Sequence, residues 1–428
     1  MDLDLNNLKV IFKSKFTKDV IWSFYSQIVL SLGYILVNTI IGNLYKAEGL
    51  GLFNQAFSIY TLSIMIANFG TWGSTVKFSA EDKDNESRNN EILTGSLILG
   101  LSFSIVLCFV ILVITNLKSD LIFNKEATVL FRNIIIGIPF FVISQNIYSF
   151  LNGIRSMKLN SILKSLRWIL IIVLLLISLF LNLELKEMVF IIPISEFIVA
   201  IISIYVVLVK YNFRIKYNSE WIKKHLNFGS KAVLVSFIGE SNNRADILIS
   251  SLFLTTSEVG VFSFASSIAR GFLVLPMVVM TNFNPIISEL ISKSEKEKLK
   301  SYIFKIRNMM MKINLPMVIV FSIAFPLYIY LFMPPQFIDS LLPFYVILLG
   351  VTIASIYYFC GAFLYMAGFP GTHLIGTIIT LVLTVSSNFI LIPAFGLLGA
   401  AIATSIFYGS MPIIQFIFIK KKLGISIL

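Results

Sequence analysis

The sequence contains few of the side chains from which catalytic and metal sites are built. Only two histidines and two cysteines occur in 428 residues, and 13% of the residues are charged. The zinc-binding pattern HExxH, the phosphate-binding pattern GxxxxGK(S/T) and the nucleophile pattern GxSxG are absent. Cys108 and Cys360 fall in apolar segments and provide neither a disulfide framework nor a metal motif. We therefore expect a protein that is not an enzyme, with no catalytic residues, no metal and no cofactor.

Apolar residues dominate instead, at 57% of the chain. A bilayer core about 30 Å thick needs roughly 20 apolar residues of helix to cross it. Lipid cannot satisfy open backbone groups, and the apolar segments lack the alternation of barrel strands, so helices are expected. The fold class predicted is an all-α polytopic membrane protein with twelve spanning helices. The expected spans are 19–43, 50–76, 92–116, 129–152, 161–181, 188–210, 228–252, 258–283, 313–333, 340–366, 372–394 and 397–419.

Positive charge is distributed unevenly between the two sides of these spans. With the N-terminus inside, the cytoplasmic segments carry 27 of the 34 Lys and Arg residues, Arg167 among them, and the opposite side carries five. Arg244 and Arg270 are the remaining two, and they lie within expected spans. This asymmetry follows the positive-inside rule and predicts that both termini are cytoplasmic. It also accounts for the net charge of +12 without a nucleic-acid partner.

Residues 209 positions apart resemble one another at three places along the chain, which indicates a tandem duplication. The first window pairs residues 51–59 with 260–268, the second 147–157 with 356–366, and the third 169–180 with 378–389. An even number of helices in each half predicts two six-helix bundles related by an axis along the membrane normal. The expected division is an N-terminal lobe at 1–212, a cytoplasmic linker at 213–227 and a C-terminal lobe at 228–428. His225 is expected to be a solvated residue of that linker.

The expected span 228–252 departs from the apolar composition of the others. At about 100° per residue, its polar residues occupy one sector of roughly 120°, with Arg244 at the edge. Ionisable groups facing lipid cost several kcal/mol each, so such a stripe lines a wet cavity or pairs across a helix interface. Arg270, in the next span, lies at a depth similar to that of Glu240 and is positioned to pair with it. The members of the stripe are Ser236, Gly239, Glu240, Asn243, Asp246 and Ser250.

Two interpretations of these charges stay open. Glu240, Arg244, Asp246 and Arg270 could neutralise one another as structural ion pairs, and Glu240 and Arg244 at i,i+4 have the favourable order. Alternatively, at least one guanidinium binds an anionic substrate, because its planar fork suits phosphate oxygens. In the N-terminal half, Glu196 is either a proton or cation site or a member of a buried pair. The neutral amides there, which either bind sugar hydroxyls or bridge helices, are Gln27, Asn38, Asn54, Gln55, Gln145, Asn146 and Asn152.

Two short patterns carry a resemblance to a known family. Residues 245–249 read ADILI and lead to EVGVF at 258–262 and then to Ala265, and their counterpart at 48–53 reads EGLGLF and leads to Ala56. With its length, twelve helices and tandem halves, the chain resembles the bacterial polysaccharide flippases of the multidrug/oligosaccharidyl-lipid/polysaccharide exporter superfamily. These are the Wzx-type transporters of O-antigen and capsule repeat units, and the resemblance covers essentially the whole chain.

The resemblance implies a function and a set of site residues. A polyprenyl-diphosphate-linked oligosaccharide is turned from the inner to the outer leaflet of the bacterial cytoplasmic membrane by alternating access, for O-antigen, lipopolysaccharide or capsule synthesis. Arg244, Arg270, Asn243 and Asn38 are the candidate substrate-binding residues. Glu240, Asp246 and Glu196 are candidates for a coupling proton or sodium ion, or for ion pairs. The expected partners are this lipid-linked substrate, membrane lipid and the coupling ion.

Three other functions are weighed against this one. A cation-coupled drug antiporter of the same superfamily would depend on unpaired carboxylates rather than on arginines. The peptidoglycan-precursor flippase is close in mechanism but resembles a fourteen-helix protein. A membrane polysaccharide polymerase or ligase would place its active site on a sizeable external loop, whereas the longest one expected here is 117–128.

Overall fold

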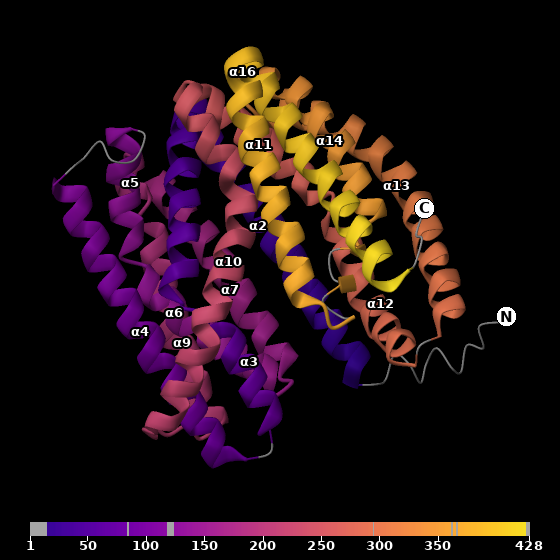
Figure 1. Cartoon of the computed structure of the whole chain (residues 1–428). Helices are drawn as coiled ribbons and strands as arrows, with labels where there is room; N and C mark the ends of the chain where they lie inside the picture. The colour runs from indigo at the N-terminus through magenta and orange to yellow at the C-terminus, as the bar shows by residue number, and fades with distance from the viewer. Residues whose placement is uncertain are drawn as a thin grey trace. The chain divides into compact units, whose positions relative to one another are not determined.

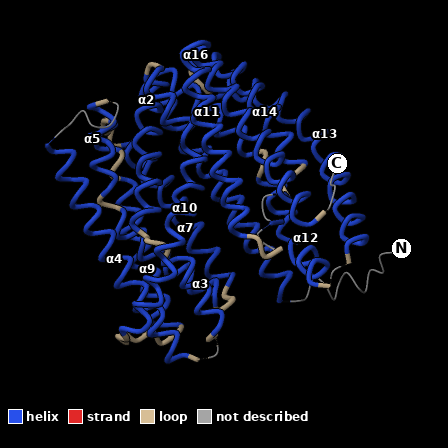
Figure 2. Tube along the Cα trace, viewed as in Figure 1, coloured by secondary structure: helices blue, strands red, loops and turns tan. Residues whose placement is uncertain are grey.

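The computed structural model describes residues 15–83, 85–117, 124–293, 295–360, 363–364 and 367–424. Throughout these residues the regular elements are helices, as Figure 2 shows. A helix satisfies its backbone groups internally, which the lipid interior requires. The prediction of an all-α polytopic membrane protein is confirmed. The chain ends, on which the predicted cytoplasmic termini depend, lie outside the described residues.

Contacts divide the chain into two compact units. Unit 1 comprises the described residues up to Val37 together with Ala56–Phe237, and unit 2 comprises Asn38–Gln55 together with the described residues from Ile238 onward. Helices α2 (Lys15–Ala67) and α10 (Ser219–Phe253) contribute residues to both units. Unit 1 also contains α3 (Thr71–Glu81), α4 (Glu86–Leu117), α5 (Lys125–Ile135), α6 (Ile138–Gly153), α7 (Met157–Phe180), α8 (Leu185–Met188) and α9 (Ile191–Lys210). Unit 2 also contains α11 (Thr256–Gly271), α12 (Val274–Ser292), α13 (Lys296–Phe332), η1 (Pro335–Ser340), α14 (Leu341–Ile356) and α16 (Pro370–Leu423).

The two longest helices each contain a sharp break. In α2 the break is at Lys46, with φ 62° and ψ −171°, and in α16 it is at Gly396, with φ 57° and ψ −132°. Figure 1 shows the two legs of α16 turning back on one another at the end that carries its label. The legs of α2 also meet, because the Asn54 side chain donates to Asn38 Oδ1 over 2.8 Å. Each of these helices therefore covers two of the expected spans.

By length and composition, the described residues contain eight helices able to cross a membrane, or nine if the bent pair α5 and α6 forms one span. The expected span 228–252 lies in α10, which is not among these helices and carries the charged residues Glu240, Arg244 and Asp246. Twelve crossings stay a prediction. The expected span 50–76 has wrong bounds, because left-handed φ values at Phe69 and Gly70 end α2 and a new helix begins at Thr71.

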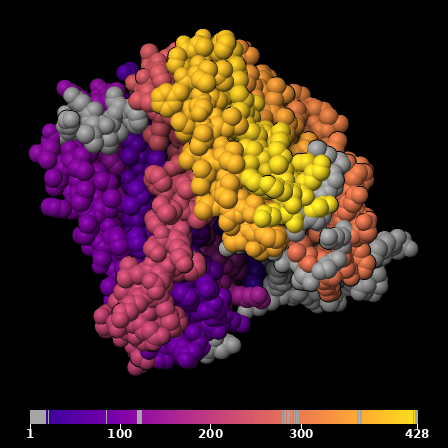
Figure 3. Space-filling view, viewed as in Figure 1, coloured from indigo at the N-terminus to yellow at the C-terminus, as the bar shows by residue number. Residues whose placement is uncertain are grey.

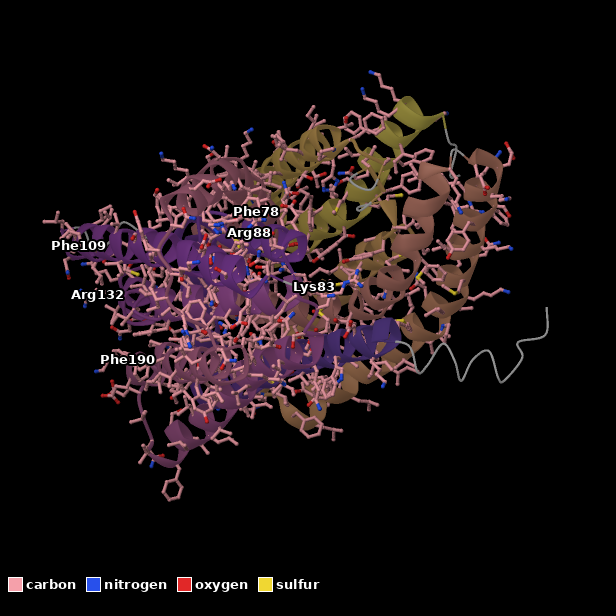
Figure 4. The ribbon with its side chains drawn as sticks, turned by 90° about the horizontal axis from the view of Figure 1, so that it is seen from below. Phe78, Lys83, Arg88, Phe109, Arg132 and Phe190 are labelled. Atoms are coloured by element: carbon pink, nitrogen blue, oxygen red, sulfur yellow. The ribbon has the colours of Figure 1, made fainter. Side chains whose placement is uncertain are left out.

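Side chains on the outer surface of unit 1 are apolar, as lipid contact requires. Phe109 on α4 is 68% exposed, and Phe190, just before α9, is 37% exposed. Figure 4 shows both at the edge of this unit, pointing outward. Exposed apolar residues on this scale would be unfavourable in water. They are consistent with a multi-pass membrane protein.

The beginning of α10 is packed against unit 1 rather than solvated, so the expectation for His225 was wrong. His225 is fully buried. Its Nδ1 lies 2.6 Å from Ser74 Oγ, and its Nε2 lies 3.0 Å from the carbonyl oxygen of Ile92. Burial lowers the pKa of His225 from 6.5 to about 4. The space-filling view shows this stretch on the surface of unit 1 (Figure 3).

The spacing of residues along α10 explains that error. Trp221, His225 and Phe228 follow at intervals of four and three, which places them on one helix face. All three rings lie against Phe78 of α3, with centroids 5.4 to 6.2 Å away. Lys223 and Lys224 are exposed on the other side. The basic residues made the segment look like a loop, whereas they mark the outer face of an amphipathic helix.

Within unit 2, α2 and α11 cross at a pair of glycines. A Cβ on Gly51 would clash with the carbonyl oxygen of Thr256, and a Cβ on Gly260 would clash with that of Ala47. These contacts are reciprocal, because 47 and 256, like 51 and 260, are 209 positions apart. Close backbone approach between helices in lipid depends on small residues of this kind.

Candidate functional site

The candidate site lies on the polar face of α10 in unit 2, where two ion pairs lie at neighbouring positions along the helix. Deeper along the helix, Arg270 of α11 binds Asp246 through Nη2. Its Nη1 donates to the main-chain oxygen of Asn243 over 2.6 Å. The arginine is therefore held at two points by one helix. Its side chain is 23% exposed, whereas that of Asp246 is 4% exposed.

Asp246 is itself fixed by residues from three helices. Its Oδ2 accepts hydrogen bonds from Ser266 of α11 over 3.4 Å and from Thr404 of α16 over 3.3 Å. Its Oδ1 accepts the main-chain N–H of Ile247 over 2.9 Å. A buried carboxylate is tolerated when both oxygens are supplied with donors in this way. Asp246 therefore holds Arg270 in a defined position.

The second pair lies within α10, and its carboxylate is more exposed than Asp246. Arg244 Nε donates to Glu240 Oε1 over 3.0 Å, one turn away on α10, and the side chains are 15% and 19% exposed. Asn243, which is exposed, donates to Glu240 Oε2 over 3.4 Å. Nothing lies within 4 Å of the position of a Cβ on Gly239. This end of the polar stripe therefore borders open space.

The structure pairs the charges as the ion-pair interpretation predicted, with one change of partner. Arg270 binds Asp246, whereas the sequence analysis paired it with Glu240. Asn38 belongs to a different network: Asn54 donates to Asn38 Oδ1 over 2.8 Å and to Ser263 Oγ over 2.9 Å. Asn38 is fully buried. Its position fits helix packing better than contact with a sugar.

In unit 1 the structure shows an ion pair that the sequence analysis missed. Arg167 of α7 contacts Glu196 Oε1 of α9 through Nε and Nη2, each over 2.6 Å. Tyr60 of α2 donates to the same oxygen over 3.4 Å. We counted Arg167 with the cytoplasmic residues because it lies only six positions into the expected span 161–181. An arginine inside an apolar segment indicates a buried ion pair, and an acidic residue in another apolar segment, such as Glu196, is the partner to look for.

Among the described residues, His, Cys, Asp and Glu form no group of three or more that could hold a metal ion. Cys108 and Cys360 are buried free thiols. The charged side chains of the two ion pairs are two arginines and two carboxylates, with a formal net charge of zero. Such a set can bind an anion only if a guanidinium shares or exchanges its carboxylate partner.

A family profile described as "Polysaccharide biosynthesis protein" matches residues 16–282. One curated relative, described as a probable low-salt glycan biosynthesis flippase, Agl15, of Haloferax volcanii, is 28% identical over 193 residues. That match covers 42% of this chain and 38% of the relative, so the chain spans well under half of that protein's length.

Solved structures show the fold. An inward-facing multidrug resistance MATE family transporter of the MOP superfamily gives a TM-score of 0.79 at 17% identity, covering 95% of this chain and 98% of that one. The lipid II flippase MurJ, in an inward closed conformation, gives 0.73 at 15% identity, covering 94% and 87%. A MOP superfamily transporter from Pyrococcus furiosus gives 0.69 at 16% identity, covering 95% and 96%. These three proteins are described as transporters or a flippase, and this chain shares their fold.

Proposed function

Because the chain belongs to the polysaccharide biosynthesis protein family, we propose that it is a flippase for a lipid-linked oligosaccharide. The substrate is a polyprenyl diphosphate carrying sugars, moved by alternating access from the inner to the outer leaflet for O-antigen, lipopolysaccharide or capsule synthesis. The observation that carries this proposal is the presence of two arginines along the polar face of α10, Arg244 on that helix and Arg270 reaching it from α11. Intramembrane arginines are costly and mark a substrate path or a structural pair.

Arg244 and Arg270 are proposed to bind the diphosphate, with different roles. Arg270 is aligned by Asp246 and the Asn243 carbonyl, so it contributes a fixed guanidinium. Arg244 is paired with Glu240 on the same helix, and we propose that an incoming phosphate takes the place of this carboxylate. Asn243 is exposed beside them and can donate to a phosphate or sugar oxygen. Asn38 is retained as a candidate for sugar binding, in a conformation that frees it from Asn54.

A coupling proton or sodium ion is proposed to act at a carboxylate of the chain. Glu240, Asp246 and Glu196 are the candidates. The halves 1–212 and 228–428 are proposed to act as six-helix lobes joined at 213–227, with both termini in the cytoplasm of a bacterium. The Lys and Arg asymmetry supports this orientation.

Arginine variants test the binding role directly. We expect Arg244→Ala and Arg270→Ala to reduce flipping of a diphosphate-linked oligosaccharide at least tenfold, in vesicles loaded with a fluorescent lipid-linked substrate. Arg→Lys should retain part of the activity, since Lys keeps the charge without the fork. Arg132→Ala is the matched control, because Arg132 is outside the stripe and is bonded to Asn116. Wild-type flipping by both stripe variants at normal membrane levels would refute the role.

A drug or cation antiporter is the second candidate, favoured by the neutralisation of both arginines by Glu240 and Asp246. A cationic substrate would compete with the guanidinium groups for these carboxylates. In that case Glu240→Gln should abolish transport of an organic cation while Arg244→Ala leaves it intact. The opposite ranking, measured on the lipid-linked substrate, supports the flippase.

A further inference from the structure

The carboxylate of Glu196 is engaged on one oxygen only. Glu196 is fully buried, and the donors from Arg167 and Tyr60 converge on Oε1. Among the described residues no group donates a hydrogen bond to the buried Oε2. An arginine fork commonly supplies both oxygens of a carboxylate in parallel. Here the geometry leaves one oxygen of a desolvated acid without a donor, a costly arrangement for a permanent anion.

The surroundings of the pair stabilise the charge of Arg167 even when Glu196 is protonated. The guanidinium carbon of Arg167 lies 5.1 Å from the ring centre of Phe141 and 5.6 Å from that of Trp168. Aromatic faces stabilise a cation at these distances. The Arg167 side chain is also 14% exposed. Arg167 therefore keeps favourable contacts when Glu196 is neutral.

The other ionisable groups near Glu196 are unsuited to take its place. Tyr60 on α2 and Tyr148 on α6 interact electrostatically with Glu196, and Cys108 on α4 with Tyr60. Lys164 of α7 lies over the Tyr148 ring, at 5.9 Å. These phenols and the thiol are neutral near pH 7. Glu196 is therefore the carboxyl group of this cluster, and its Oε2, which receives no hydrogen bond from the described residues, is where a proton can bind.

We propose that Glu196 and Arg167 form an exchangeable-proton site in unit 1, in which a proton from water binds Oε2 and Arg167 remains as the internal cation. The step converts a neutral pair into a buried acid beside a charged guanidinium. It needs no redox partner, since a single O–H bond forms and breaks. That the proton drives transport rests on the proposed flippase function, but proton exchange itself does not.

Infrared difference spectra of the purified full-length protein between pH 9 and pH 5 test proton exchange without any transport substrate. We expect a carbonyl band of a protonated carboxylic acid that grows as the pH falls. It should be lost in Glu196→Gln and kept in Asp246→Asn, the matched control from the ion pair of unit 2. If Glu196→Gln fails to fold, the double variant Arg167→Gln/Glu196→Gln neutralises both partners and serves in its place.

Two results would overturn the proposal. One is a Glu196 band that is absent, or present and unchanged, over the whole pH range, because then no proton is exchanged. The other is a Glu196-dependent spectral change on replacing K⁺ by Na⁺ at constant pH, because the occupant would then be a metal cation. In vesicles, loss of pH-dependent flipping in Glu196→Gln adds the link to transport. A flipping failure with the band intact would count against the flippase, not against the proton site.

Discussion

Each unit contains a buried ion pair between an arginine and a carboxylate, but the hydrogen-bond donors to the two carboxylates differ. Asp246 in unit 2 has donors on both oxygens and is held from three helices, while its arginine is 23% exposed. Glu196 in unit 1 receives its donors on one oxygen, and its arginine is 14% exposed beside two rings. In unit 2 both oxygens of the carboxylate have hydrogen-bond donors, and the guanidinium is partly exposed. In unit 1 the carboxylate is buried, and one of its oxygens has no donor among the described residues. This difference supports our two proposals, anion binding at the pair of unit 2 and proton exchange at the pair of unit 1.

The largest effect is expected from removing one member of each pair. At pH 8, Arg167→Ala should lower the free energy of unfolding by about 3–5 kcal/mol, because it leaves a buried carboxylate without its counter-charge. Arg270→Ala should cost only about 1–3 kcal/mol, since Asp246 keeps its other donors. Denaturant or thermal unfolding in detergent measures both. An equal loss of unfolding free energy in the two variants would show that the additional donors to Asp246 do not affect stability.

Acid should weaken unit 1 through His225, which lies outside the membrane-spanning segments. Its pKa is about 4 in the folded protein, below the unfolded value of about 6.5. Stability is therefore full above pH 6.5 and is lost as the pH falls toward 4, by about 3 kcal/mol. Unfolding measured at each pH, in wild type and in His225→Gln, isolates this contribution. A wild-type curve parallel to that of the variant would contradict the assignment.

The glycine crossing of unit 2 should respond to an added methyl group. Gly51→Ala and Gly260→Ala each place a Cβ against a main-chain oxygen, and overpacking of this kind costs typically 1–3 kcal/mol. Gly376→Ala is a softer comparison, because its Cβ would meet the flexible end of Gln415. Unfolding temperatures rank the three variants. Gly51→Ala as stable as wild type would mean that the helices separate freely there.

The smallest effect concerns Gly239, at the point where α10 passes from unit 1 to unit 2. Because its Cβ would meet nothing within 4 Å, Gly239→Ala should raise helix stability by up to about 1 kcal/mol. We expect slower flipping as well, since the helix loses a flexible point. Gly409→Ala, in the interior of α16 with equally open space, is the control that should gain stability without slowing transport. Equal flipping rates in both would remove any special role of Gly239.

Much of this arrangement could be predicted from the sequence, because lipid imposes simple rules. The all-helical membrane fold, the polar stripe and the pairing of Glu240 with Arg244 follow from hydropathy and helical periodicity. His225 was misjudged because basic neighbours hid an apolar face at spacings of four and three. Arg167 was misjudged because a charge near the end of an apolar segment was counted with the adjoining loop. Which acid pairs with Arg270 depends on the rotation of one helix against another, and single-helix periodicity does not determine it.

Helix α10 is anchored in unit 1 by His225, which contacts α3, and in unit 2 by Asp246, which binds Arg270 of α11. Each added residue would rotate one anchor against the other by about 100° and separate them by about 1.5 Å. An insertion or deletion between these residues therefore changes which side chains of α10 share a face with His225 and which share a face with Asp246. A change of eighteen residues, about five whole turns, would restore the rotation. An insertion of that length would place the two residues about 27 Å farther apart along the helix axis, roughly the thickness of the bilayer core.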